Sequence, residues 1–302
     1  MNMKIGILSQ DIELYSTRRL YDSAISKGHE TEVVSYLKCY MSIAKSRPRI
    51  FASGEELHYD TIIPRIAASW TFYGAAVVRQ FELKGTLSAN SSASISRARD
   101  KLRALQIMGN SGVEMPVTGY VHFSRDIRSV LETVGKPPFV IKSLEGTQGR
   151  GVLLAETLDA AVGAIEAMKK LNLNILVQEF IGEAKGEDIR AIVVGNKVVA
   201  SMKRKAKPGD FRANIHLGGS SKKYKLTPEE EKTAITAAKV LGLSVAGVDM
   251  IQSDRGTLVI EVNSSPGLQG IETTSEIDVA SAIIEFMEEC INKEYKSRKL
   301  DI

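Results

Sequence analysis

The chain has few of the residues on which several common kinds of protein depend. It has two cysteines in 302 residues, and these two, Cys39 and Cys290, lie too far apart to form a zinc-binding spacing. Such scarcity is typical of a reducing compartment. No run of about 18 apolar residues occurs, and the N-terminus MNMKIGILSQD has the pattern of a strand and not of a signal peptide. We therefore expect a cytoplasmic protein with no membrane partner.

A strong excess of charge is also missing. The 40 lysines and arginines against 36 acidic residues leave a formal net charge of +4, which does not by itself imply nucleic-acid binding. With 43% hydrophobic residues and a length of 302 residues, the chain has the composition of a globular protein with two or three packed units. It contains no internal repeat and no low-complexity tract.

Strands and helices alternate in the first hundred residues. KIGILS is an apolar run, residues 14–27 have helical spacing, and TEVVSY follows as a second strand. A strand–helix–strand unit of this size favours a parallel sheet, to which DTIIPRI adds a strand and TFYGAAVVRQFELKG a helix. The serine-rich segment TLSANSSASIS is the best candidate for a domain boundary.

Beyond this boundary the pattern predicts further strands and helices. The expected strands are PVTGYV, PPFVIK, VLLAE and NILVQEFI, and the expected helices are RARDKLRALQIMGNSG, residues 159–171, residues 228–241 and SEIDVASAIIEFMEECINK. Two hairpins complete the set: DIRAIVVGNKVVASMKRK, turning at Gly195 and Asn196, and AGVDMIQSDRGTLVIEVNSS, turning near Arg255.

A lysine precedes a glycine-rich stretch in IKSLEGTQGRGV. A P-loop has its lysine after the last glycine, whereas Lys142 comes before Gly146, Gly149 and Gly151. The spacing does not fit a dinucleotide fingerprint either, and a strand follows where that fingerprint needs a helix. The stretch is therefore strand, glycine-rich turn, strand. It is either a flap that folds over a nucleotide or a plain hairpin.

The second hairpin indicates a metal site. If its turn is centred on Arg255, Asp249 lies opposite Glu261, and Asn263 shares a face with Glu261. The opposite face is then filled by Val248, Met250, Ile260 and Val262. No counter-charge is evident in this pattern, and facing carboxylates repel each other unless a cation lies between them. An all-oxygen set suits Mg²⁺ or Mn²⁺ and not Zn²⁺. The alternative is a solvated acidic face.

The first hairpin is basic. Asp188 and Arg190 share a face, and a turn at Gly195 sets Asp188 opposite Lys203, where a salt bridge is an adequate explanation. The run MKRKAKPGDFRAN contains Lys203, Arg204, Lys205, Lys207 and Arg212. Since Phe211 is its only aromatic residue, a site for phosphate and carboxylate groups explains this run better than a nucleic-acid surface. Lysines merely in solvent remain an alternative. Taken together, these pieces describe a nucleoside triphosphate site between two subdomains.

Seven segments in this order resemble the ATP-grasp ligases, and among them the RimK-like glutamate ligases, over nearly the whole chain. They are RARDKLRALQ, FVIKSLEGTQGRGV, LVQEFI, EDIRAIVVG, GDFRANIHLGG, AGVDMI and IEVNSSPGLQGIE. The resemblance implies an α/β fold with a Rossmann-like pre-ATP-grasp domain at 1–97. Two ATP-grasp subdomains follow at 98–181 and 182–302, with the nucleotide between their sheets.

The resemblance also assigns residues. Lys101 and Lys142 would hold the ATP phosphates, with the segment from Gly146 through Gly149 to Gly151 closing over them. Glu179, Phe180 and Ile181 would lie at the adenine, Asp188 at the ribose, and Arg212, Ala213 and Asn214 would reach the nucleotide from a loop. Asp249, Glu261 and Asn263 would coordinate two Mg²⁺ or Mn²⁺ ions. Arg190 and Arg204 would stabilise the charge on an acyl phosphate and on the tetrahedral intermediate that follows.

The implied reaction transfers the γ-phosphate of ATP to a carboxylate, and an amine then attacks the acyl phosphate. In the RimK-like ligases glutamate is added to the C-terminus of a small-subunit ribosomal protein, and a homo-oligomer such as a tetramer is expected. Relatives attach glutamate to cofactors or act on amino-group carrier proteins. Three departures leave the acceptor open: Ser264 stands where the resemblance leads us to expect alanine, Lys205 stands where it leads us to expect arginine, and the segment SSKKYKLT is more basic than expected. A non-catalytic nucleotide-binding regulator and an RNA-binding protein remain alternative classes.

Overall fold

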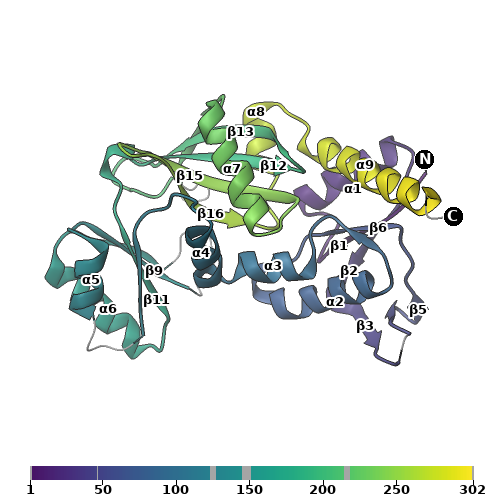
Figure 1. The fold of residues 1–302 in the computed structure, drawn as a ribbon, viewed down its shortest axis with the longest axis horizontal. Helices are drawn as coiled ribbons and strands as arrows, with labels where there is room; N and C mark the ends of the chain where they lie inside the picture. The colour runs from purple at the N-terminus through teal and green to yellow at the C-terminus, as the bar shows by residue number, and fades with distance from the viewer. Residues whose placement is uncertain (1, 46, 123–126, 145–150, 214–217, 301–302) are drawn as a thin grey trace.

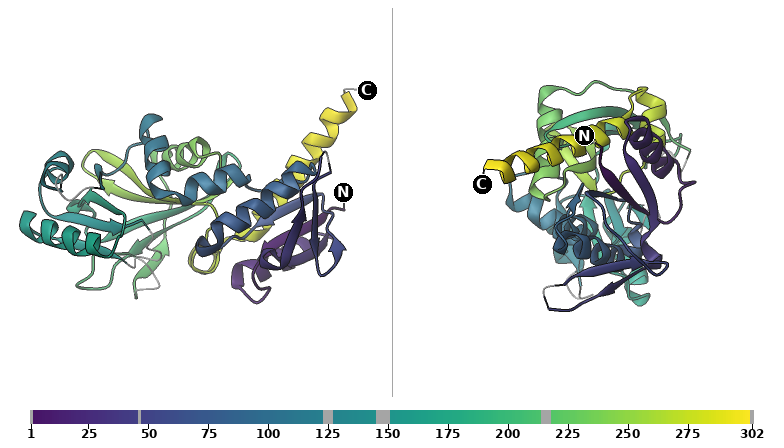
Figure 2. Two further views of the ribbon diagram at one scale, coloured as in Figure 1. Left: turned by 90° about the horizontal axis from the view of Figure 1, so that it is seen from below. Right: turned by 90° about the vertical axis from the view of Figure 1, so that its right-hand side faces the viewer.

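The computed structural model describes residues 2–45, 47–122, 127–144, 151–213 and 218–300, with side chains described as far as residue 293. The elements form three sheets of four or five strands and one small sheet, arranged along an elongated molecule (Figure 1). Figure 2 shows the same arrangement from two further sides. The N- and C-termini both lie at the end of the molecule that the N-terminal domain occupies.

The N-terminal domain contains a parallel sheet in the order β2-β1-β6-β7, which confirms the parallel sheet expected from the strand–helix–strand pattern. Its elements are β1 (Lys4–Ser9), α1 (Tyr15–Ser26), β2 (Glu30–Ser35), β6 (Thr61–Pro64), α2 (Thr71–Leu83) and β7 (Leu87–Ser88). A side sheet that the sequence pattern did not reveal consists of β3 (Cys39–Ser42), β4 (Arg49–Ala52) and β5 (Glu55–Glu56), next to the short helices η1 (Tyr36–Lys38) and η2 (Ala68–Trp70).

The serine-rich segment after α2 is structured. It contains β7 and the start of α3 (Ser92–Arg99), because the Ser91 hydroxyl caps that helix by accepting from Ser94 N at 3.1 Å. The single helix expected at 97–112 is wrong. Asp100 has an extended backbone and caps a separate helix, α4 (Lys101–Asn110), by accepting from Arg103 N at 3.0 Å.

The central subdomain is an antiparallel sheet in the order β10-β9-β11-β8. It comprises β8 (Thr118–Val121), α5 (Ile127–Val134), β9 (Phe139–Ser143), β10 (Val152–Ala155), α6 (Leu158–Lys170) and β11 (Ile175–Glu179). Helices α5 and α6 bury one face of this sheet together with Ile141, Ile175 and Val177. Because side chains alternate along a strand, Lys142 and Gln178 project from the opposite face.

The C-terminal subdomain has a sheet in the order β14-β13-β12-β15-β16. Its elements are η4 (Gly182–Ala184), β12 (Glu187–Val194), β13 (Lys197–Lys205), β14 (Ser220–Lys223), α7 (Pro228–Val240), β15 (Val245–Ser253), β16 (Gly256–Asn263), α8 (Gln269–Ser275) and α9 (Val279–Leu300). Both predicted hairpins are confirmed, as β12–β13 and β15–β16. Helix α7 begins with a capping box between Thr227 and Glu230 and has Pro228 in its first turn, which fixes its start.

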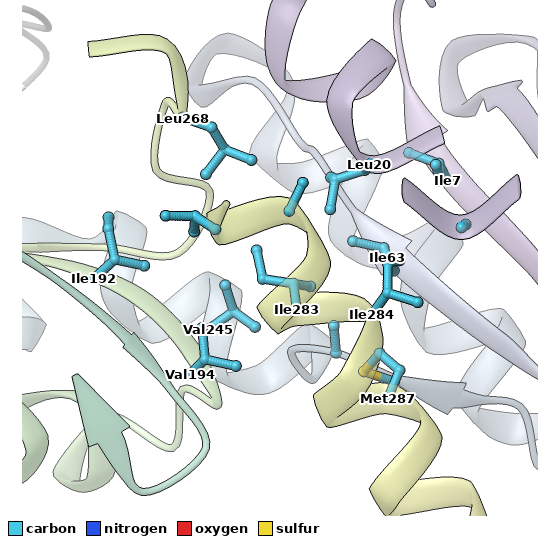
Figure 3. Close-up of a cluster of buried hydrophobic side chains, with 14 of the residues drawn as sticks. Ile7, Leu20, Ile63, Ile192, Val194, Val245, Leu268, Ile283, Ile284 and Met287 are labelled. Carbon is cyan, nitrogen blue, oxygen red and sulfur yellow. The ribbon is translucent and has the colours of Figure 1, made fainter. Parts of the chain in front are cut away.

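Helix α9 lies between the N-terminal domain and the C-terminal sheet (Figure 3). Its buried residues Ile283, Ile284 and Met287 lie in one core with side chains of the N-terminal domain and of the C-terminal sheet. The members labelled on those two sides are Ile7, Leu20 and Ile63, and Ile192, Val194 and Val245. A continuous apolar core of this kind fixes the N-terminal domain against the C-terminal sheet.

Asn90 adds a polar link between the same two parts. Its side chain, 3% exposed, donates to Val245 O at 2.7 Å and to Ser264 O at 3.0 Å. It also accepts from the backbone N–H groups of Ser244 and Val245 at 2.9 and 3.0 Å. The loop after β16 is therefore held against the end of the N-terminal sheet.

Candidate nucleotide and metal site

The glycine-rich stretch connects two paired strands. β9 and β10 are antiparallel, with Lys142 opposite Val152, which confirms the two strands predicted for this stretch. Gly151 has φ +73°, a conformation that favours glycine, and its carbonyl accepts from Ser143 N at 3.0 Å. Gly146 and Gly149 lie outside the described residues.

Two other charged residues, Lys101 and Glu261, act electrostatically on Lys142. Its ammonium donates to Gln178 Oε1, and burial lowers its pKa to about 8, an effect that Glu261 opposes and Lys101 reinforces. Lys101 begins α4 and Glu261 lies on β16, so residues from three parts of the chain act on one another here. Gln178 was missed by the sequence analysis, although a glutamine within the apolar run ILVQEF was a usable signal.

The segment assigned to the adenine connects the central sheet to β15–β16. The carboxylate of Glu179 accepts from Val117 N at 2.7 Å and forms an ion pair with Arg255 at the β15–β16 turn. Ile181 is 7% exposed and packs with Leu258 of β16. Glu179 and Ile181 therefore contribute to the junction of the two subdomains.

Phe180 makes a second contact in the same region. Its ring meets Phe211 edge to face, with centroids 6.1 Å apart, which brings the segment assigned to the adenine next to the loop after β13. In that loop Arg212 is bonded to Asp210, Ala213 is 5% exposed, and Asn214 lies outside the described residues. The side chain of Asp210 holds the loop locally, and the pKa of its carboxyl falls to about 2 because it accepts from Arg212.

Asp249 and Glu261 face each other across β15 and β16, as the sequence predicted, although the turn is not centred on Arg255. Ser253 pairs with Gly256, so Asp254 and Arg255 form a two-residue loop, and a bulge between Asp249 and Met250 then shifts the register by one residue. The bulge restores the facing of the two carboxylates. The sequence pattern placed Ile260 on the buried face of the hairpin. Because of the bulge, Val259 is buried there instead, and Ile260 is only partly buried.

The expectation that Asp249 has no counter-charge is wrong. β12 pairs with the other side of β15 and sets Arg190 opposite Asp249. Arg190 Nε and Nη2 donate to the two oxygens of Asp249 at 2.7 and 2.6 Å, and Arg204 Nη2 lies 3.3 Å from Oδ1. Burial opposes ionisation of Asp249, but the two guanidinium groups outweigh it and hold the pKa of this carboxyl below its usual value.

The donor set nevertheless fits a hard divalent cation. The described residues contain no cluster of three His, Cys, Asp or Glu side chains arranged for a metal, so Asn263 would have to supply an amide oxygen beside Asp249 and Glu261. A carboxylate has about four acceptor positions, so Asp249 can serve an arginine and a cation together. Glu261 is exposed and accessible to an ion.

The register of the first hairpin differs from the expected one. A bulge between Ile192 and Val193 shifts the pairing, so Asp188 lies opposite Arg204 and not opposite Lys203. Arg204 Nε and Nη2 donate to the two oxygens of Asp188 at 2.6 and 2.7 Å. Together with Arg190 and Asp249, these residues form an alternating row of charge across β13, β12 and β15.

The basic run on this hairpin does not form one positive surface. Alternation along β13 turns Arg204 inward, 4% exposed, while Lys203 lies over the Tyr224 ring at 4.4 Å and Lys205 is 3.5 Å from Glu187. The prediction of one concentrated phosphate and carboxylate site from Lys203 to Arg212 is therefore wrong for these side chains, because local acidic partners take up much of the charge.

A pocket of about 410 Å³ lies beside this region, between α4, the loop that follows it, and the sheet strands β8 and β11. It is lined mainly by apolar residues such as Leu102, Leu105, Met115 and Leu176. Of the residues assigned to the nucleotide or the metals, those that the structure describes do not line this pocket.

Solved structures with the same fold are ATP-grasp enzymes. The ATP-grasp ligase PsnB, complexed with a phosphomimetic variant of its minimal precursor, Mg and ADP, matches with a TM-score of 0.74 at 18% identity over 96% of this chain and 98% of that one. A RimK domain ATP-grasp protein from Sphaerobacter thermophilus matches with a TM-score of 0.70 at 22% identity over 94% and 98% of the two chains. The chain therefore has the ATP-grasp fold.

Sequence comparison places the chain in one family within the ATP-grasp proteins. The RimK pre-ATP-grasp domain matches residues 3–95 and the RimK-like ATP-grasp domain matches residues 98–287. A probable alpha-L-glutamate ligase from Picosynechococcus is 58% identical over 95% of each chain, and one from Coxiella burnetii is 55% identical over 95% of each. The chain belongs to the RimK-like ATP-grasp family and is an ATP-dependent ligase. Within the described residues, the helices are too short or too polar to cross a membrane.

Proposed function

We propose that this protein is an ATP-dependent glutamate ligase that adds glutamate to the C-terminus of a small-subunit ribosomal protein through an acyl phosphate. The observation that carries the proposal is the convergence of Lys142, Lys101 and Glu261 from three elements of an ATP-grasp fold. The choice of glutamate is supported by the names of relatives that are 55–58% identical over 95% of the chain.

In this proposal Lys101 and Lys142 bind the phosphates of ATP. A lysine whose pKa burial has lowered to about 8 has lost part of its hydration, so a phosphate restores more interaction energy to it than to a lysine in water. Phe180 and Ile181 provide the apolar contacts for adenine, and Asp188 is the ribose ligand.

The carboxylates of Asp249 and Glu261, with the amide oxygen of Asn263, would hold two Mg²⁺ or Mn²⁺ ions. When bound, such ions neutralise charge on the β- and γ-phosphates, which assists attack on the γ-phosphorus.

The reaction has two steps. A carboxylate oxygen of the acceptor forms a bond to the γ-phosphorus and the bond to ADP breaks, which gives an acyl phosphate and ADP. The amine of glutamate then attacks the acyl carbon, phosphate leaves, and the amine loses a proton to form the amide. Arg190 and Arg204 lie in the charged row beside Asp249, and we assign them to the negative charge that develops on the acyl phosphate and on the tetrahedral intermediate.

The test is intact-mass measurement of small-subunit ribosomal proteins incubated with enzyme, ATP, Mg²⁺ and each amino acid in turn. We expect ADP and phosphate as products, glutamate as the amino acid used, and one ribosomal protein whose mass rises in steps of one glutamate residue. Turnover of ATP with a free metabolite, and no mass change in any ribosomal protein, would instead support the second candidate function. That candidate joins an amino acid to a small cofactor or an amino-group carrier protein, and it is favoured by Ser264 and Lys205, where the family resemblance leads us to expect other residues.

A further inference from the structure

Two arginines lie next to each other where the N-terminal domain meets the C-terminal subdomain. Arg65 follows β6, and its Nη2 donates to Pro266 O at 2.7 Å, in the loop after β16. Arg99 ends α3, and its Nη2 donates to Ile66 O at 2.6 Å. In the part of the chain that the structure describes, neither guanidinium has a carboxylate at ion-pair distance; both bond only to carbonyl oxygens.

This arrangement is electrostatically unfavourable by itself. Burial, reinforced by the charge of Arg99, lowers the pKa of Arg65 to about 10. Burial also lowers the pKa of Arg99, and the charge of Glu261 opposes that effect. Two desolvated like charges destabilise a fold unless an anion joins them, and their position beside a metal and nucleotide site points to a ligand.

Hydrogen-bond donors without partners lie at the same junction. The hydroxyls of Ser264 and Ser265 and the Nε of Arg99 are buried and have no hydrogen-bond partner among the residues that the structure describes. Ser264 is 2% exposed, and its carbonyl is fixed by Asn90 at 3.0 Å. Buried donors in folded proteins are nearly always satisfied, so unpaired donors beside two arginines indicate that an acceptor group belongs here.

We propose that Arg65, Arg99, Ser264 and Ser265 form a carboxylate-binding subsite for the incoming amino acid. The inference rests on the ligase function proposed above. The two serines directly follow Asn263, so the subsite adjoins the face that carries Glu261. The acceptor carboxylate loses its charge when it becomes an acyl phosphate, whereas a carboxylate of the amino acid stays charged throughout the reaction. A permanent pair of arginines matches the group whose charge does not change.

The test separates the amino-acid step from the phosphoryl step. Wild type and the variants Arg65→Lys, Arg99→Lys and Ser264→Ala are assayed for ADP release at saturating acceptor, first with glutamate and then with hydroxylamine as the amine. Hydroxylamine attacks an acyl phosphate to give a hydroxamate and phosphate, and it has no carboxylate. Arg97→Gln, on the same helix as Arg99, is the matched control, because its Nε bonds only to a backbone carbonyl at an exposed position.

We expect the KM for glutamate to rise about 10- to 100-fold in each lysine variant and about 3- to 10-fold in Ser264→Ala, with the KM for ATP within twofold of wild type. The hydroxylamine rate should be unchanged in all of them, which also shows that they fold. The subsite proposal would be refuted if the rates with glutamate and with hydroxylamine fell to the same extent. A raised KM for the acceptor in the hydroxylamine assay would refute it too. Failure of wild type to form any hydroxamate with any acceptor would instead refute the ligase function itself.

Discussion

Replacing Lys142 by methionine should stabilise the nucleotide-free protein at neutral pH. The pKa of Lys142 is lowered to about 8 in the folded protein, chiefly by burial, against about 10.5 for a lysine in the unfolded chain. The charged form is therefore the one that folding disfavours. A difference of 2.5 pKa units corresponds to about 3 kcal/mol of lost stability below pH 8, and this loss fades as pH rises from 8 to 10.5, to about 1 kcal/mol at pH 10.

The variant removes this cost and also one hydrogen bond. Loss of the bond to Gln178 subtracts about 1 kcal/mol, so Lys142→Met should be more stable than wild type by about 2 kcal/mol at pH 7 and about equal to it at pH 10. Urea denaturation of both proteins at the two pH values measures the difference, and other titrating groups cancel between them. A wild type that is as stable as the variant at pH 7 would contradict the assignment of a desolvated, charged Lys142.

The same shift has a consequence for nucleotide binding. Phosphates favour the protonated lysine, so binding of ATP at pH 8 should take up about half a proton, which calorimetry in buffers of different ionisation enthalpy detects. Lys142→Arg is the matched control, since arginine stays charged and should take up none. Equal proton uptake in the two proteins would mean that another group titrates.

Further variants test other parts of the structure. Asp249→Asn should lower the free energy of unfolding by about 3–5 kcal/mol, because Arg190 loses its anionic partner and Arg204 loses one of its two. Glu261→Gln, at an exposed position, should change it by about 0.5 kcal/mol or less and still abolish ligation. Asn90→Ala should cost about 2–4 kcal/mol in chemical unfolding, because four hydrogen bonds that join the segment after β7 to the C-terminal subdomain are lost. Gly195→Ala should destabilise the protein by about 1–2 kcal/mol at the β12–β13 hairpin, since φ is +63° and the added carbon would lie 2.9 Å from the Phe286 ring. Gly163→Ala, in helix α6 with open space around the added carbon, should instead raise the stability, and thermal unfolding of the two variants measures both changes.

Local patterns predicted most of the longer elements but missed the side sheet β3–β5 and the helices α5 and α8, and they predicted the strand registers less well. The β15–β16 hairpin follows from apolar alternation around a turn, but the facing of Asp249 and Glu261 depends on a bulge that offsets an error in the predicted turn. In the β12–β13 hairpin a bulge had the opposite effect and moved Asp188 from Lys203 to Arg204. Bulges change the pairing by one residue, and their positions depend on tertiary packing more than on the strand's own sequence.

Local patterns could not predict which residues meet when their segments are far apart in the sequence. Arg190 lies opposite Asp249 because β12 inserts between β13 and β15, an order fixed by the sheet as a whole. The same holds for Arg65 and Arg99, which are 34 positions apart in the sequence and meet because Arg99, at the end of α3, donates to the carbonyl of Ile66, next to Arg65. The residues that bind nucleotide and metal in our proposal were named from family resemblance, and their roles stay predictions.

In our proposal the N-terminal domain contributes to the active site through one residue of the arginine pair, Arg65. Every residue that we assign to the nucleotide or the metals lies at position 101 or beyond, so the parallel sheet contributes none of them. Its strand β6 is nevertheless followed directly by Arg65, whose guanidinium donates to the carbonyl of Pro266, three residues after the proposed metal ligand Asn263. The apolar core around α9 and the hydrogen bonds of Asn90 hold these two segments together. A rigid interface of this kind is what a carboxylate subsite needs if it is built from two domains, because a shift of about 1 Å in either arginine would break its hydrogen bonds to the substrate.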